Sequence, residues 1–348
     1  MKEMKEVDEE VPLKLPKVKV GITYNLKKGI QSEAVDNEAE YDNIETVYAI
    51  QRALEGAGAK VILMEADETL PETLKKHPVD IVFNIAEGIR GRGREAQIPA
   101  LLNMYGIPYT GSDETTLCIA LDKALTKRLL STFHINTPRY AVISKHSKAK
   151  LSQLRYPVIL KPNAEGSSKG ISDISIAKDA KQLRTLADRN LVIYDQDMLV
   201  EEYIEGREFT VGLLGNGENV IVFSPMEIVY KKETQESYHV YSYNVKQDYE
   251  NYVQYECPAN IDEDIINQMV KDSKKIFNAL SCHDFARIDF RVSKEGKVFF
   301  IEINPLPGLA PNYSDYPMLA EFNGMKHEQL VVSVLAQALK RYGIGQVM

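Results

Sequence analysis

The stretch from Ala286 to Pro307, ARIDFRVSKEGKVFFIEINPLP, carries polar side chains at a spacing that could bind a metal ion. Apolar and polar residues alternate over 286–292, which is the pattern of a half-buried strand. Residues 298–304 are apolar except for Glu302 and Asn304, and a Lys-Glu-Gly-Lys turn separates the two runs. The sequence therefore predicts an antiparallel hairpin.

The register of this hairpin decides which polar side chains meet. A turn centred on the Glu-Gly pair places Asp289 opposite Glu302, and it also places Asn304 beside Arg287. Two carboxylates this close repel each other unless a cation lies between them, and such oxygen ligands suit Mg²⁺. A surface hairpin with a charged face is the alternative. The apolar neighbours and the rigid Pro-Leu-Pro-Gly end favour the metal site.

The composition is that of a globular protein with two or three domains. The chain has 348 residues, 44% of them apolar, and no long apolar run. Its net charge of -8 argues against nucleic acid and anionic membranes as partners. The three cysteines form no close-spaced pair, which favours free thiols in a reducing cytoplasm. We expect the charged segment 1–16 to be a loose arm or an extra strand, not a signal peptide.

Alternating strand and helix patterns over the first third of the chain predict an α/β unit with a parallel sheet, whose ligands bind at the carboxyl ends of the strands. Strands are expected at 17–24, 59–64 and 79–85, and helices at 43–58 and 95–105. A strand and turn at 107–112 close the unit, and one long helix is expected from there to about His134. Lys123 lies on its polar face, where a solvated position is the simplest interpretation.

Three arginines, at positions 90, 92 and 94, interrupt the glycine-rich loop that follows the third strand. The GxxGxG spacing of this loop is not a dinucleotide fingerprint. The loop lies between a strand end and a helix start, where partial positive charge already favours anions. Each arginine singly could point into water. Together they predict that at least one, for which we select Arg92, sets substrate choice, and that the substrate is more anionic than alanine.

A phosphate-binding flap is predicted in the middle of the chain. Strands at 139–144 and 157–160 lead into the loop from Lys161 to Gly170, KPNAEGSSKG, and a further strand follows at 171–176. The backbone N–H groups of such a glycine-serine loop can bind phosphate oxygens, and Lys161 adds a positive charge at the strand end. The loop is not a P-loop, because a P-loop leads into a helix. A merely flexible hairpin is the alternative.

Two acidic residues on neighbouring strand patterns could contact a nucleoside. Strands are expected at 198–204, MLVEEYI, and at 208–214, EFTVGLL. Glu201 can accept a hydrogen bond from an adenine amine and Glu208 from ribose hydroxyls, although an exposed strand acid is the alternative at each position. The rest of the chain predicts a strand-like stretch at 220–230, helices at 262–280 and 327–342, and a loop at 308–324.

Taken together, these motifs resemble the ATP-grasp superfamily and, within it, the D-alanine–D-alanine ligases. The resemblance covers residues 17–339. It rests on IPYTGS at 107–112, Asp122-Lys123 with Thr126-Lys127, PVILKPNAEGSSKG at 157–170, VEEYIEGREFTV at 200–211, and ARIDF with FIEINPLPG in the hairpin. It implies a three-domain ATP-grasp architecture with a Rossmann-like substrate domain at 17–113, a central α+β lid domain at 114–205 and an α+β catalytic domain at 206–341.

The resemblance implies roles residue by residue. Lys123 and Lys161 match the lysines that bind ATP phosphates, and Arg287 matches the arginine that stabilises the tetrahedral intermediate. Ser167 and Lys246 match residues near the first substrate and the transferred phosphoryl group. The other implied nucleotide contacts are Glu165, Gly166, Ser167, Ser168, Gly170, Glu201, Glu202, Tyr203, Ile204 and Glu208. The implied ligands of Mg²⁺, which Mn²⁺ could replace, are Asp289, Glu302 and Asn304.

The substrate-binding parts depart from the family pattern. The family's Gly-Gly-x-Ser-x-Glu stretch is absent after the first strand, and Glu40 is at a suitable distance to hold the ammonium of the first substrate. The family's serine-leucine, which meets the carboxylate of the second substrate, is Ser314-Asp315 here, after a one-residue insertion. A histidine-glycine pair is Glu87-Gly88, and Gln247 replaces a tyrosine.

The resemblance implies an ATP-dependent carboxylate–amine ligase that works through an acyl phosphate and releases ADP and phosphate. One alternative is a ligase of the same chemistry that forms a different amino-acid or natural-product amide. Another is a nucleotide-binding regulatory protein, although such a module needs no transition-state arginine. We expect small-molecule carboxylate and amine substrates, no nucleic-acid or membrane partner, a homodimer and a cytoplasmic location.

Replacing a metal ligand tests the hairpin. Asp289→Asn or Glu302→Gln should abolish turnover and leave the fold intact, since a polar swap on an exposed face costs little stability. Turnover is measured as Mg²⁺-dependent ADP release, and the fold by circular dichroism. Mg²⁺-dependent ATP hydrolysis at the wild-type rate in either variant would contradict the assignment.

Overall fold

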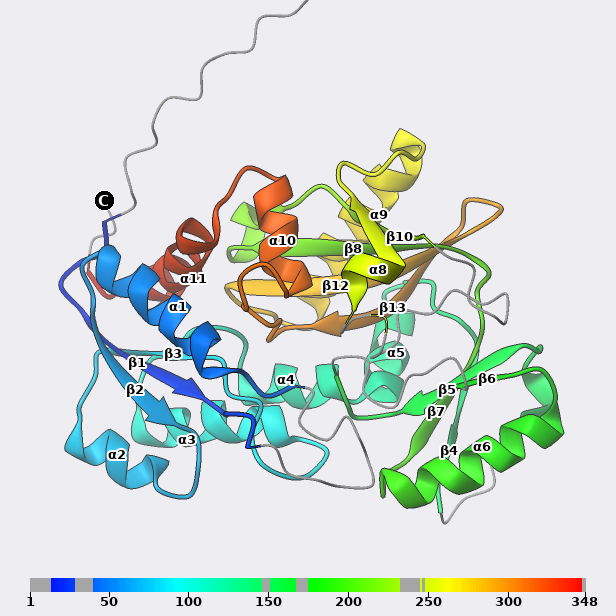
Figure 1. Ribbon diagram of the computed structural model, residues 1–348, viewed down its shortest axis with the longest axis horizontal. Helices are drawn as coiled ribbons and strands as arrows, with labels where there is room; N and C mark the ends of the chain where they lie inside the picture. Colours follow the sequence, from blue (N-terminus) through cyan, green and yellow to red (C-terminus); the bar gives the residue numbers. More distant parts are fainter. Residues whose placement is uncertain are drawn as a thin grey trace, which may run out of the picture.

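The computed structural model describes residues 14–28, 40–145, 151–166, 175–231, 245 and 248–345. Within these residues the strands form three sheets, which occupy three regions of the molecule in Figure 1. One sheet is parallel and the other two are antiparallel, so the predicted α/β fold class with α+β parts is confirmed. No helix in the described part of the chain is long and apolar enough to span a membrane.

The first sheet has the strand order β2-β1-β3, and both pairs are parallel, as predicted. Val20 and Ile22 of β1 have no exposed surface, because a central parallel strand is covered on both faces. The elements of this region are β1 (Lys19–Tyr24), α1 (Ile44–Gly56), β2 (Lys60–Glu65), α2 (Leu70–Lys76), β3 (Ile81–Asn84), the 3-10 helix η1 (Arg94–Ala96) and α3 (Gln97–Tyr105).

The second sheet has the order β4-β7-β5-β6, and each neighbouring pair is antiparallel. Leu183 and Ala187 of α6 pack with Val158 and Val200 of the sheet in one apolar cluster. In Figure 1 this sheet lies at the opposite end of the molecule from the parallel sheet. The elements are α4 (Glu114–Leu121), α5 (Lys123–Ser131), β4 (Tyr140–Ile143), η2 (Leu151–Gln153), β5 (Val158–Pro162), β6 (Ile176–Ala177), α6 (Ala180–Ile193) and β7 (Met198–Glu202).

The third sheet has the order β11-β10-β8-β12-β13, with β9 paired to β8. The predicted hairpin register is confirmed, because Asp289 pairs with Glu302. Arg287 likewise pairs with Asn304, and a β-bulge follows Asp289. The elements are β8 (Gly206–Leu214), η4 (Gly217–Asn219), β9 (Ile221–Val222), β10 (Met226–Tyr230), α8 (Tyr249–Tyr252), β11 (Val253–Glu256), α9 (Glu263–Ala279), β12 (Phe285–Ser293), β13 (Val298–Asn304), α10 (Asp315–Phe322) and α11 (His327–Tyr342).

The strand expected at 107–112 is only an isolated bridge between Val82 and Tyr109, and two further predictions of secondary structure were wrong. The single helix expected up to His134 is two helices, α4 and α5, because the backbone is extended at Asp122. The Asp122 carboxylate accepts a hydrogen bond from the Leu125 N–H and so caps α5. The loop expected at 308–324 contains α10, which has Pro317 in its first turn, where a helix needs no N–H donor.

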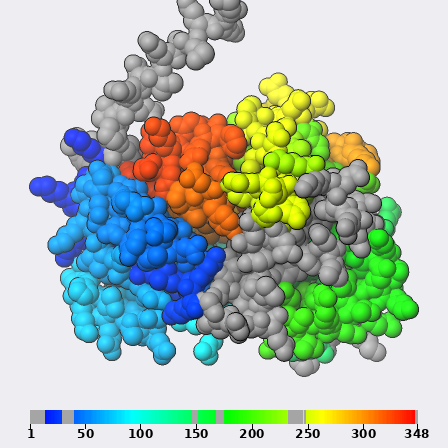
Figure 2. Space-filling view, in the orientation of Figure 1, coloured from blue at the N-terminus to red at the C-terminus, as the bar shows by residue number. Residues whose placement is uncertain are grey.

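The first and the last helix of the chain share one core. α1 and α11 pack against each other, and residues of β1, α1, α10 and α11 belong to one apolar cluster. Val47 and Ile50 of α1 have no exposed surface, and neither have Leu335 and Leu339 of α11. Figure 2 shows the blue N-terminal surface directly beside the red and orange C-terminal helices. The segments around β1 and β3 are thereby held next to the hairpin.

A buried aspartate connects three distant segments. Asp284, which precedes β12, accepts hydrogen bonds at 2.8 Å from the Gly111 N–H and the Asn216 side chain. Arg341 of α11 donates to the same carboxylate from Nη2, also at 2.8 Å. The aspartate has no exposed surface. One carboxylate therefore fixes the turn after Tyr109, the start of β12 and the end of α11.

Removal of this carboxylate should destabilise the protein. Asp284→Ala leaves the Arg341 guanidinium without its partner, and loss of one partner from a buried ion pair costs about 3–5 kcal/mol. The free energy of unfolding is measured by urea titration. Lys294→Met is the control, because the pair of Lys294 with Glu205 lies on the surface and its loss should leave the midpoint unchanged. A wild-type midpoint for Asp284→Ala would show that the connection is dispensable.

Candidate active site

One face of the hairpin carries a network of charges centred on Asp289. Arg287 Nε lies 3.0 Å from Asp289 Oδ1, and Arg287 Nη2 lies 2.9 Å from Oδ2. Thr210, directly opposite on β8, donates its hydroxyl to Oδ1 at 2.7 Å, and Asn304 Nδ2 lies 3.4 Å from Oδ2. Arg287 Nη1 also donates to Asp315 at 3.2 Å. Two carboxylates therefore fix the guanidinium.

Glu302 on β13 faces several cations. Lys123, the first residue of α5, places its Nζ 3.5 Å from the Glu302 carboxylate and also donates to the Glu165 carbonyl. Burial disfavours the ionised form, but the surrounding cations lower the pKa of Glu302 to about 2; the main ones are Lys123, Lys161 and Arg287. Glu302 is therefore ionised at neutral pH.

Asp289, Glu302 and Asn304 fit the ligand set of a magnesium ion. Carboxylate and amide oxygens are hard donors of the kind that Mg²⁺ prefers. Asp289 Oδ2 accepts one short hydrogen bond, from Arg287, and its second contact, with Asn304 Nδ2, is 3.4 Å long, so this oxygen is the one that a metal ion would bind in place of Asn304. The chemistry of the donors agrees with the sequence-based expectation, and the metal-binding role of the three residues stays a prediction.

A second cluster of charges is buried between α5 and the second sheet. The Glu201 carboxylate lies 2.6 Å from Lys127 Nζ and 2.7 Å from Lys161 Nζ. Lys127 also donates to Thr137 Oγ1 at 2.7 Å and to the Ile301 carbonyl at 2.9 Å. Although burial opposes its charge, the two lysines lower the pKa of Glu201 below its ordinary value. Sequence reasoning assigned no role to Lys127. The only indication that this lysine matters was its place in the Thr126-Lys127 motif.

Glu208 is also paired within the protein. It accepts a hydrogen bond from Tyr230 Oη at 2.9 Å and lies 3.3 Å from Arg291 Nη1. Arg291 also contacts the Tyr203 hydroxyl at 3.2 Å. Burial raises the pKa of Glu208 above its ordinary value. These residues border the connection 203–205, which joins the second sheet to the third.

The nucleotide-binding roles stay predictions. Glu202 accepts a hydrogen bond from the Arg155 N–H at 2.9 Å, and Ile204 is half-buried. Some of the predicted catalytic and flap residues lie outside the described residues, namely Ser167, Ser168, Gly170 and Lys246. The described members of the set are Lys123, Lys161, Glu165, Gly166, Glu201, Glu202, Tyr203, Ile204 and Glu208.

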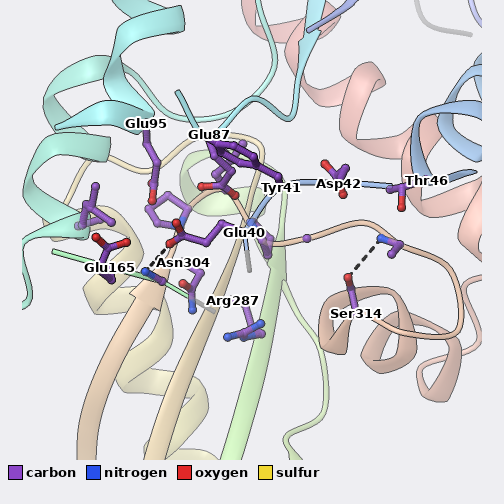
Figure 3. A pocket seen from close by; sticks show the side chains of 18 of the residues that line it. Glu40, Tyr41, Asp42, Thr46, Glu87, Glu95, Glu165, Arg287, Asn304 and Ser314 are labelled. Carbon is purple, nitrogen blue, oxygen red and sulfur yellow. Dashed lines mark hydrogen bonds between the residues drawn. The ribbon is translucent and has the colours of Figure 1, made fainter. Parts of the chain in front are cut away.

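A pocket gathers residues from distant parts of the chain (Figure 3). Ser314 lies at the N-terminus of α10, where its Oγ accepts the Ala310 N–H at 3.2 Å. The pocket brings two of the three predicted substrate residues, Glu40 and Ser314, to the hairpin. Its lining includes these predicted site residues: Glu40, Lys123, Glu165, Gly166, Arg287, Asn304 and Ser314.

The arginine loop is divided between two environments. Arg94 is buried and forms ion pairs with Glu40 and, at 3.3 Å, with Glu165. Arg92 is 75% exposed, pairs with Asp122 at 2.8 Å and lines a neighbouring cavity. It is not in the lining of the pocket in Figure 3. A substrate-binding role for Arg92 stays a prediction.

Sequence reasoning placed no substrate contact at three acidic residues that line the pocket, Asp42, Glu87 and Glu95. Burial raises the pKa of Asp42 and of Glu95 to about 7. Burial and its acidic neighbours also raise the pKa of Glu87. The sequence held a signal for only one of them, because Glu87 occupies the position at which the family pattern has a histidine.

The three sheets and the charged hairpin define an ATP-grasp protein. Residues 129–336, more than half of the chain, match the family model described as D-ala D-ala ligase C-terminus. The chain belongs to the D-alanine–D-alanine ligase family, as the sequence motifs predicted, and it is an ATP-dependent carboxylate–amine ligase. A regulatory protein without ligase activity is therefore not favoured.

Relatives and solved structures agree with this assignment. A D-alanine–D-alanine ligase of Aquifex aeolicus is 33% identical over 296 residues, which cover 84% of this chain and 94% of that protein. An uncharacterised protein of Sinorhizobium fredii is 33% identical over 307 residues, with coverage of 84% and 87%. A crystal structure of a D-alanine–D-alanine ligase of Bacillus anthracis complexed with ATP has a similar fold, with a TM-score of 0.73 at 22% sequence identity. The match covers 94% of this chain and 100% of that one.

Glu201→Gln tests the buried cluster. The neutral amide leaves two buried lysines without a counter-charge, so the free energy of unfolding should fall by about 3 kcal/mol. Urea titration measures it. Glu202→Gln, one position further along β7, is the control, because a glutamine oxygen can still accept the Arg155 N–H. Equal stability of the two variants would contradict the structural role of the cluster.

Proposed function

We propose that this ligase activates the carboxylate of a small amino acid with ATP and joins it to an amine in the pocket of Figure 3. The products are an amide, ADP and phosphate. The observation that carries this proposal is the lining of one pocket by Arg287 and Asn304 of the hairpin together with Glu40 and Ser314. The names of the relatives, D-alanine–D-alanine ligases, support amino acids as both substrates.

In the first step, a carboxylate oxygen of the first substrate attacks the γ-phosphorus of ATP, and the bond to the ADP oxygen breaks. Lys123 and Lys161 offset the negative charge of the phosphates. Asp289, Glu302 and Asn304 would hold Mg²⁺ or Mn²⁺, which would neutralise further phosphate charge when bound. Glu165 and Gly166 contribute the base of the flap, which excludes water from the acyl phosphate.

In the second step, the amine nitrogen attacks the acyl carbon, phosphate leaves, and the nitrogen loses a proton to solvent. Arg287, fixed by Asp289 and Asp315, holds its guanidinium in the pocket, where the oxyanion develops. Glu40 holds the ammonium of the first substrate. Ser314, at the start of α10, contacts the carboxylate of the second substrate.

The remaining expectations belong to the same proposal. The nucleoside lies along 201–208, with Glu201 at the adenine and Glu208 at the ribose. The domains are 17–113, 114–205 and 206–341. We also propose a homodimer, which light scattering can test, and a cytoplasmic location, which three free cysteines support.

Arg287→Met tests the ligase mechanism. Loss of a charged donor to the oxyanion should lower kcat by about a hundredfold. The assay is ADP release that requires both an amino-acid carboxylate and an amine. Arg52→Met, an exposed position on α1, is the control and should keep wild-type kcat. An Arg287→Met enzyme with wild-type kcat, or ADP release that needs no amine, would contradict the proposal.

A further inference from the structure

One end of the pocket is lined by three carboxylates that come from separate segments. Glu40 precedes α1, Glu87 follows β3, and Glu95 belongs to η1. One oxygen from each lies within 4.8 Å of the others, and Figure 3 shows the three side chains directed toward the same space. Arg287 and Lys123 line the same pocket, so the acidic end belongs to the reaction site.

Glu40 already has partners within the protein. One of its oxygens accepts the Gly166 N–H, and the other pairs with Arg94 Nη2. The rest of the Arg94 guanidinium is engaged elsewhere, because Nη1 donates to the Ala164 carbonyl at 3.0 Å and Nη2 also lies 3.3 Å from Glu165. Arg94 therefore compensates Glu40 and Glu165, and it forms no ion pair with Glu87 or Glu95.

Glu95 forms no direct contact with a cation, and Arg94 and Lys123 act on it only at longer range. The residue is 8% exposed, lines the pocket, and its side chain forms no hydrogen bond or ion pair with any residue that the structure describes. Glu87 likewise forms none within the described part of the chain. Burial raises the pKa of both carboxyls, that of Glu95 to about 7. A cation that enters from the pocket would stabilise the ionised form of such a buried carboxyl, which burial alone disfavours.

We propose that Glu87 and Glu95 form a subsite for a positively charged side-chain group of the first substrate, which makes that substrate a small basic amino acid. This inference rests on the proposed function, in which Glu40 holds the α-ammonium. Because the three carboxylates lie within 4.8 Å of one another, the two positive groups are separated by only a few bonds. Diaminopropionate and diaminobutyrate have this geometry. The inference replaces the expectation of an anionic substrate.

The free lone pairs of the three carboxylates match the two ammonium groups of a diamino acid. Each oxygen of Glu40 accepts one hydrogen bond from the protein and keeps one lone pair for the α-ammonium. Glu87 and Glu95 accept no hydrogen bond within the described residues, so both are open to the side-chain ammonium, whose three N–H donors are satisfied by two carboxylates and one further acceptor.

Substrate competition tests the proposal in the wild-type enzyme. ADP release is measured with alanine, 2,3-diaminopropionate, 2,4-diaminobutyrate and aspartate of both hands as carboxylate donors, with ATP, Mg²⁺ and a common amine acceptor. We expect kcat/KM for a diamino acid to exceed that for alanine at least tenfold, because a charged hydrogen-bonded contact contributes about that much. Equal or higher values for alanine or aspartate would overturn the proposal.

Variants assign the preference to the two carboxylates. Glu87→Gln and Glu95→Gln should each lower kcat/KM at least tenfold more for the diamino acid than for alanine. Glu72→Gln, an exposed glutamate of α2, is the matched control and should leave both values unchanged. Variants that retain the wild-type preference would overturn the proposal, and so would stoichiometric Mn²⁺ binding, without nucleotide, that disappears in both variants.

Direct binding separates this inference from the proposed function. Calorimetric titration of diaminopropionate into wild-type enzyme with a non-hydrolysable ATP analogue needs no turnover. Binding at least tenfold tighter than that of alanine supports the subsite even if no amide forms, in which case the proposed function alone fails. Equal binding of both amino acids together with amine-dependent ADP release would overturn the subsite and leave the proposed function intact.

Discussion

The site depends on the register in which β12 pairs with its neighbours. Arg287, Asp289 and Arg291 alternate with buried apolar residues, so all three point to one face of the sheet. On that face Asp289 meets Thr210 and Arg291 meets Glu208, and each partner lies directly opposite on β8. A slip by one residue would turn these charges toward α9 and expose the apolar residues that pack against it. One register therefore brings Arg287, Asp289 and Glu208 to the same face of the sheet.

Features set by local periodicity and turn chemistry could be predicted from the sequence. The hairpin register followed from the position of one Glu-Gly turn, and the parallel sheet followed from the alternation of strands and helices. The break at Asp122 could not be predicted, because the apolar pattern continues across it. That break is stabilised by residues distant in sequence, since the Asp122 carboxylate also binds Asn163 at 2.8 Å and Arg92. Similarly, α10 is anchored by Tyr316, whose hydroxyl donates to the Leu213 carbonyl.

Residues of the candidate site that belong to a recognisable motif could be predicted from the sequence. Residues whose importance comes from being buried by packing could not. The ligase motifs indicated the hairpin and singled out Lys123 and Lys161, and the structure places both lysines close to Glu302 or Glu201. By contrast, Lys127 lies on a polar helix stripe, and only the structure shows that it is 1% exposed and paired with Glu201. The arginine loop shows the same limit. Arg92 and Arg94 occupy equivalent positions in the loop sequence, yet Arg92 is largely exposed and pairs with Asp122, whereas Arg94 is buried and pairs with Glu40. The net charge at the pocket depends on which arginine is buried beside it, because Arg94 offsets the charge of Glu40 and Arg92 does not.

The packing of α11 against α1 has a consequence for biosynthesis. The apolar residues that cover Val47, Ile50 and Leu54 include some from α11, so they leave the ribosome long after α1 does. Contacts between such distant positions form slowly, because a long chain segment must close before they contribute. A nascent chain that ends before α11 therefore exposes an apolar stripe on α1 that is open to chaperones and to aggregation. The wall of the pocket that carries Glu40 and Glu87 is therefore fully supported only after α11 has been synthesised.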